Sequence, residues 1–282
     1  MSDSHPSHPT AESEPRLRHE FVGMMFAVTI GEVGLQGAGL VQAGQPMHFL
    51  PAYGHLLLAT MVVATSWVGW SASVAPGARK DVDHVFQWEF LVLVLDVFLV
   101  VVYFIIVRTI DFAKEGSPRI DSPSTVAGWV VLVFILYLAW DFLTKVLISW
   151  RDRDTPNKKL GEHFNGSWLR LTGSRMVPTL VCFVLALSTW RCARNADRPH
   201  YLTADFSMLW LVLLFRVLKE LVSAYFPSPA GRHIPKPGMS KKSAVGWTIV
   251  CGLLLSVGLA WTAFSWPLPL PARIVAAIRN GP

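Results

Sequence analysis

The sequence has few charged residues and few cysteines. Charged side chains make up 16% of the 282 residues, whereas hydrophobic residues make up 52%. A soluble globular protein usually carries about 25% charged residues, so this chain lacks the groups that keep a folded surface in water. Its three cysteines fit neither a disulfide framework nor the spacing of a metal site. These absences exclude an ordinary soluble enzyme, a disulfide-rich secreted domain and disorder over most of the length.

The sequence also lacks the short motifs of several enzyme classes. It contains no HExxH of zinc proteases, no GxSxG of serine hydrolases and no GxxxxGKS phosphate loop. We therefore expect no catalytic site of these types, no cofactor and no metal. The net charge of +6 does not predict nucleic-acid binding, because the Lys and Arg residues lie mostly in short segments between apolar runs.

The sequence is rich in long apolar runs. A bilayer span takes about 20 residues, and seven runs reach or approach that length: 21–42, 53–73, 86–107, 126–150, 176–193, 205–226 and 245–266. Lipid cannot satisfy exposed backbone N–H and C=O groups, so such runs must be helical. The sequence predicts an all-α, polytopic transmembrane helical bundle of about seven spans, with six as the alternative, and no large soluble domain.

The predicted organisation has three parts. A disordered tail over residues 1–20 is rich in Ser, Pro, His and charge, a transmembrane domain covers residues 21–266, and a short tail covers residues 267–282. If the amino terminus is cytoplasmic, the cytoplasmic segments carry more Lys and Arg than the opposite ones. The positive-inside rule then predicts this orientation, in a bacterial-type inner membrane.

Charged residues at membrane depth are the candidate functional residues. Glu32, Asp96 and Arg216 lie near the middle of three separate runs. A charge at the centre of the bilayer costs about 2.5–3.5 kcal/mol on insertion scales. We therefore expect these three side chains to meet in the bundle interior, either as a structural lock or as a gate.

A second polar layer is expected nearer the cytoplasm. Glu89 lies seven residues before Asp96, so both occupy one helical face. Asp141 and Lys145 lie four residues apart and can pair within one helix. Such residues form either a stepwise path for cations or salt bridges that anchor the helix ends.

The first run also carries a surface of small residues. Gly23, Ala27 and Gly31 recur every four residues, and Gly34 continues the surface. Small residues at this spacing let a neighbouring helix approach closely. The pattern predicts tight packing, either inside the bundle or between copies in a homo-oligomer.

These features favour an ion or small-solute pathway through the lipid bilayer, with a channel preferred to a coupled transporter. One alternative is a non-enzymatic scaffold or effector that binds a cytoplasmic protein partner through the basic loop between Arg151 and Arg175. A second alternative is a membrane-embedded lipid-modifying enzyme.

Overall fold

The computed structural model describes residues 17–43, 50–73, 88–112, 119–151, 167–195 and 201–225. Within these ranges, six helices are long and apolar enough to cross a membrane. They are α1 (Leu17–Gln42), α2 (Leu50–Ser73), α3 (Trp88–Val107), α4 (Pro123–Arg151), α5 (Ser167–Asn195) and α6 (Tyr201–Tyr225). The all-α transmembrane bundle is confirmed. The predicted span 245–266 and the tail 267–282 lie outside the described residues.

Five of the six helices, all except α3, begin earlier than the apolar runs predict. Helix α1 starts at Leu17, inside the tail predicted for residues 1–20, of which 1–16 lie outside the described residues. Helix α5 starts at Ser167, so the expected basic loop is shorter than 151–175, and its residues 152–166 lie outside the described part of the chain. Hydropathy detects only the apolar part of a helix, and a helix that continues into water escapes it.

The start of α4 is set by local chemistry. Pro123 occupies the first helical position, where its missing N–H costs nothing. The hydroxyl of Ser122 accepts a hydrogen bond from the Thr125 backbone N–H at 3.3 Å. Ser122 is therefore the N-cap residue, and α4 begins three residues before the predicted run.

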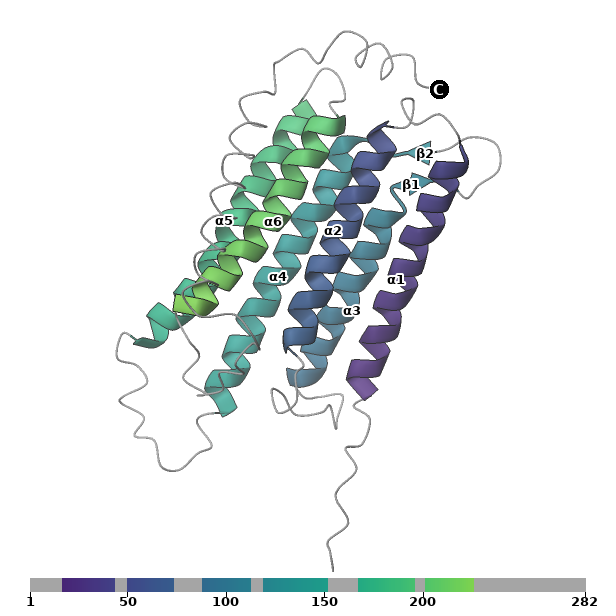
Figure 1. Cartoon of the computed structure of the whole chain (residues 1–282). Coiled ribbons are helices and arrows are strands. Elements are labelled where there is room, and N and C mark those ends of the chain that lie inside the picture. The colour runs from purple at the N-terminus through teal and green to yellow at the C-terminus, as the bar shows by residue number, and fades with distance from the viewer. Residues whose placement is uncertain are drawn as a thin grey trace, which may run out of the picture.

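A short β-hairpin joins α3 to α4. Strand β1 (Ile110–Asp111) pairs antiparallel with β2 (Arg119–Ile120), with Ile110 opposite Ile120 and Asp111 opposite Arg119. Figure 1 shows it at the end of the bundle where α1, α3 and α5 finish. We call this the hairpin end, and the end where these three helices begin the N-terminal end.

The helices form a bundle with α1 and α5 on its two flanks (Figure 1). Helix α1 packs on α2 and α3, while α5 packs on α4 and α6. The core lies chiefly among α2, α3, α4 and α6; its largest fully buried side chains include Leu58, Tyr103, Ile106, Phe134 and Leu211. The four inner helices therefore enclose the space in which a buried site can form.

The small residues of α1 pack differently from the prediction. A Cβ added at Gly31 or Gly34 meets no described atom within 4 Å, and Ala27 is exposed. Only Gly23 faces a neighbour, since its added Cβ would lie 3.9 Å from the Trp67 ring. Tight packing of this surface inside the described bundle is thus wrong for Ala27, Gly31 and Gly34. The four-residue recurrence of small residues therefore lies mostly on an exposed face of α1 and not on its packed face.

The close contact of α1 lies instead at Gly39. A Cβ at Gly39 would fall 2.9 Å from the Phe112 Cβ and 3.0 Å from the Phe112 carbonyl oxygen. Phe112 directly follows β1, so the absence of a side chain at position 39 lets α1 rest on the hairpin.

Substitution of these glycines tests the arrangement. Gly39→Ala is expected to lower the free energy of unfolding by about 1–3 kcal/mol, because the hairpin must move away from α1. Gly31→Ala and Gly34→Ala are the matched controls. They are expected to be neutral or to stabilise by up to about 1 kcal/mol, since alanine favours helix. Thermal unfolding in detergent measures all three, and equal losses at the three positions would contradict the packing.

Candidate functional site

A cavity of about 180 Å³ lies inside the bundle, lined by residues of α1, α2, α3, α4 and α6. Four of its lining side chains are ionisable acids and bases: Asp96, Asp141, Arg216 and Lys219. Most of the remaining wall is aromatic or aliphatic, and includes Phe26, Trp70, Tyr103, Phe134, Tyr137 and Phe215. The cavity thus concentrates charge inside an otherwise apolar interior.

Asp141 joins three helices. Its Oδ2 accepts a hydrogen bond from Lys219 Nζ of α6 at 2.6 Å and another from Thr179 Oγ1 of α5 at 2.6 Å. Asp141 is buried, and Lys219 also lies over the Phe215 ring, 5.4 Å from its centroid. Hydrogen bonds between an ammonium group and a carboxylate are shorter and stronger than those between neutral groups. This contact fixes the relative positions of α4, α5 and α6.

Asp96 of α3 is held by the neighbouring residue of α4. Its Oδ1 accepts a hydrogen bond from the Trp140 indole N–H at 2.8 Å, and only 3% of Asp96 is exposed. Trp140 directly precedes Asp141, so successive residues of α4 position both carboxylates of the cavity wall.

Arg216 of α6 pairs with Glu220, one turn further along the same helix. Its guanidinium also approaches α2, because a Cβ added at Gly69 would lie 3.4 Å from one guanidinium nitrogen. A glycine at position 69 leaves room for the arginine between α2 and α6. The cation therefore reaches the cavity without separating the two helices.

Three hydroxyl groups from three helices form a chain in the cavity wall. Tyr137 Oη lies 2.7 Å from Ser66 Oγ and 2.9 Å from Tyr103 Oη. Each hydroxyl can donate or accept, so the direction of the hydrogen bonds can reverse by rotation of the O–H groups. The chain gives the cavity wall a second polar surface beside the charged one.

The structure brings together part of the predicted polar residues. Asp96, Asp141 and Arg216 line one cavity. Asp141 pairs with Lys219 of α6, a partner that the sequence did not predict. The side chains of Glu89 and Lys145 lie outside the described residues. Trp140, Thr179 and the tyrosines were not predicted, because uncharged residues in an apolar run carry no distinctive sequence signal.

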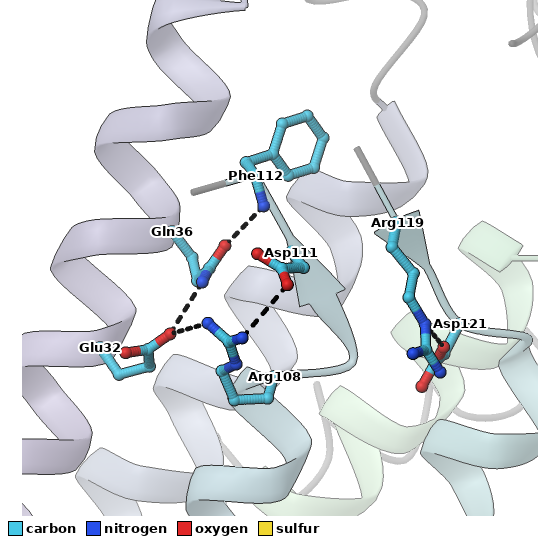
Figure 2. A network of polar contacts seen from close by, with 7 residues as sticks. All are labelled: Glu32, Gln36, Arg108, Asp111, Phe112, Arg119 and Asp121. Atoms are coloured by element: carbon cyan, nitrogen blue, oxygen red, sulfur yellow. Dashed lines mark hydrogen bonds and ion pairs between the residues drawn. The ribbon is translucent and has the colours of Figure 1, made fainter. Parts of the chain in front are cut away.

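Glu32 does not join this cavity, so that expectation is wrong. Figure 2 shows its carboxylate between two donors: Arg108 at 2.9 Å and Gln36 at 2.7 Å. Arg108 also binds Asp111 at 3.1 Å, and the Gln36 side-chain oxygen accepts the Phe112 N–H at 2.8 Å. Arg108 lies just beyond the apolar run of α3, where its long side chain reaches back to Glu32. The hydrogen bond to Glu32 raises the pKa of the Arg108 guanidinium.

The residues Glu32, Gln36, Arg108, Asp111 and Phe112 form what we call the hairpin clamp. Each of these residues forms a hydrogen bond with another residue of the clamp, and together they join α1 to the hairpin (Figure 2). Nearby, Arg119 of β2 pairs at 2.8 Å with Asp121, the residue that follows this strand. A network whose members bind one another is typical of a structural contact.

No protein-family model, curated protein or solved structure matches this chain. Among the residues that the structure describes, no three His, Cys, Asp or Glu side chains group in a way that would hold a metal ion. The chain is an integral membrane protein with at least six helices able to span a bilayer. Its function must therefore be argued from the cavity and its polar contacts.

A double-mutant cycle tests the hairpin clamp. Glu32→Gln combined with Arg108→Gln is expected to show a coupling energy of about 0.5–1.5 kcal/mol, since this pair is only partly exposed. The pair of Asp121 and Arg119 is the control, because 75% of the Arg119 side chain is exposed. Asp121→Asn combined with Arg119→Gln is expected to give a coupling below about 0.5 kcal/mol. Unfolding in detergent provides the energies, and equal coupling in both cycles would contradict a stabilising clamp.

Proposed function

We propose that this membrane protein passes an ion or a small polar solute across the bilayer, and that the cavity is its binding site. One observation carries the proposal: Asp96, Asp141, Arg216 and Lys219, from three different helices, line a single intramembrane cavity. Charged residues within membrane spans are costly and commonly mark the path of a solute or ion. A purely structural bundle has no need for a hollow at the place where its charges gather.

The size of the cavity limits the solute. Its volume of about 180 Å³ has room for several water molecules. That space suits a partly hydrated ion or a small organic molecule, and it is too small for a lipid. Both signs of charge are present in the wall, so a solute can exchange contacts with either a carboxylate or a cation.

The cavity favours a gated pathway over a permanently open pore. Apolar side chains are buried on the side of the cavity toward the hairpin end, among them Leu58, Ile106 and Val126. The more exposed charged residues, Arg216 and Lys219, belong to the half of α6 nearer the N-terminal end. We infer that the cavity opens toward the N-terminal end, which is the cytoplasmic side in the proposed orientation. The sequence alone favoured a channel, whereas this geometry supports a closed channel or a transporter in one of its states.

Liposomes containing the full chain test the proposal. Efflux of potassium, chloride and small uncharged osmolytes is measured separately, by ion-selective dyes and by light scattering. Asp141→Asn and Lys219→Gln are each expected to lower the efflux rate of the probe that the wild type transports by about tenfold. This factor corresponds to a loss of about 1.4 kcal/mol in the interaction of the solute with the cavity. Glu32→Gln is the matched carboxylate control and is expected to keep its flux, because Glu32 lies outside the cavity. No protein-dependent flux of any probe would overturn the proposal.

The direction of opening is tested by thiol labelling. In a background free of Cys182, Cys192 and Cys251, the variants Thr65→Cys and Leu58→Cys are exposed to an impermeant thiol reagent from each side of sealed vesicles. Thr65 lines the cavity, so it is expected to react only from the cytoplasmic side. Leu58 is fully buried in the apolar layer and is expected to react from neither side. Rapid reaction at position 58 from both sides would indicate an open pore instead.

A further inference from the structure

A second polar pair is buried between α2 and α6, near the hairpin end and separate from the cavity. His55 Nε2 lies 3.2 Å from Asp205 Oδ1, and the two side chains are 0% and 3% exposed. His55 is the sixth residue of α2 and Asp205 the fifth of α6. At 1.5 Å per residue, the pair lies about 6–8 Å from the start of each helix, a short distance from the membrane surface.

The neighbouring glycine gives this pair its space. A Cβ added at Gly54 would lie 2.8 Å from Asp205 Oδ2, closer than any real side chain allows. The residue beside His55 thus has no side chain, and the carboxylate of α6 occupies the space that one would fill. The Asp205 carboxylate can approach α2 only because of this glycine.

The pair is incompletely bonded, unlike the hairpin clamp. His55 Nδ1 and Asp205 Oδ2 are buried and have no hydrogen-bond partner among the described residues. The contact between Nε2 and Oδ1 has the distance of an ion pair but lacks the alignment of a hydrogen bond. Buried polar groups are usually fully hydrogen-bonded, and an exception calls for a functional explanation.

We propose that His55 and Asp205 form a proton-binding site between α2 and α6. With a neutral imidazole and an ionised carboxylate, the pair carries one negative charge in an apolar environment. Uptake of one proton from water makes the pair neutral overall, either as imidazolium and carboxylate or as imidazole and carboxylic acid. Burial favours the neutral, proton-loaded pair, because an unbalanced charge in a low-dielectric interior costs several kcal/mol.

Other ionisable groups of the described residues lie near this pair. From α6, Tyr201 faces His55 with 5.8 Å between ring centroids. Beyond Tyr201, Asp121 at the start of the segment before α4 is already paired with Arg119.

The other elements packed on α2 at this end carry the hairpin clamp. In it, the Arg108 guanidinium binds two carboxylates, Glu32 of α1 and Asp111 of β1. The carboxylate of Asp205 instead faces an imidazole, and one proton changes the net charge of the pair of His55 and Asp205 between −1 and zero.

The α2–α6 contact connects this pair to the cavity. At the hairpin end it holds Gly54 against Asp205, and further along the same two helices it holds Gly69 against Arg216. Loss of the proton leaves a buried negative charge that weakens the contact at the hairpin end. This is the contact that must separate for the cavity to open toward that side. The coupling step rests on the proposed function, whereas proton binding does not.

Infrared difference spectroscopy tests proton binding directly. The full-length protein in nanodiscs, with no solute added, is compared between about pH 5 and pH 8, the range in which histidine commonly titrates. The chain has nine histidines, so the difference spectrum of each variant is subtracted from that of the wild type. We expect one reversible component, with both imidazole and carboxyl bands, to be missing from both His55→Gln and Asp205→Asn. Asp121→Asn, which removes a carboxylate at the same end of the bundle, is expected to retain this component. Loss of imidazole bands alone in His55→Gln, or of carboxyl bands alone in Asp205→Asn, would overturn the proposal.

The double variant is a control for destabilisation of the fold by the single substitutions. His55→Gln with Asp205→Asn replaces the pair by two uncharged amides, and it is expected to unfold at a higher temperature than either single variant. In the wild type, the bound proton stabilises the folded state. The midpoint temperature of unfolding is therefore expected to fall as the pH rises, by about 2–4 °C for each kcal/mol by which the free energy of unfolding decreases. The double variant is expected to lose this pH dependence. An unchanged pH dependence in the double variant would overturn the proposal.

The two proposals fail in different ways. A protein that carries the pH-dependent signal but moves none of the flux probes retains the proton site and loses the proposed transport function. A protein that moves a probe but lacks the signal retains the transport function and loses the proton site.

Discussion

The bundle depends on the balance of charges that lie between helices. Asp141 and Lys219 join α4 to α6, Glu32 and Arg108 join α1 to α3, and His55 and Asp205 join α2 to α6. A charge left alone in a low-dielectric interior is far more costly than a charge with a partner, even though the pair itself adds little net stability. These contacts therefore act mainly by excluding other helix arrangements, in which one or more charges would lose its partner.

Helix α6 has a central place in this balance. Asp205 and Arg216 are eleven residues apart, which is just over three complete turns, so both lie on nearly the same face. Each lies against a glycine of α2, Gly54 and Gly69 respectively. Lys219, one turn beyond Arg216, turns instead toward α4. One helix thus presents acidic and basic groups to two neighbours, while its remaining surface packs in the apolar core.

The fold was largely predictable from the sequence, because the cost of exposing backbone in lipid leaves helices as the reasonable form for long apolar runs. Asp96, Asp141 and Arg216 were also identified, since an ionisable residue within such a run is rare. Their partners were not. A depth estimated from residue counts placed Glu32 beside Asp96 and Arg216, but it could not include the rotation of α1 or the reach of Arg108.

The buried pair of His55 and Asp205 had a weaker signal. Both residues lie near the starts of their helices, where polar residues are usually hydrated, and only the rotation of α2 and α6 turns them inward. Gly39, Gly54 and Gly69 were missed for the same reason. Their role depends on which residue approaches from the neighbouring element, whereas the regular spacing of small residues on α1 meets a described neighbour only at Gly23.

The hairpin clamp has a consequence for biogenesis. Glu32 precedes Arg108 by 76 residues, so the ribosome delivers the acid to the membrane long before its base. Until α3 arrives, α1 carries an uncompensated carboxylate within its apolar segment. The nascent first helix is then best accommodated at the insertion machinery or near the headgroups. Its final placement follows the release of α3, which makes integration of the amino-terminal half a joint event of several segments.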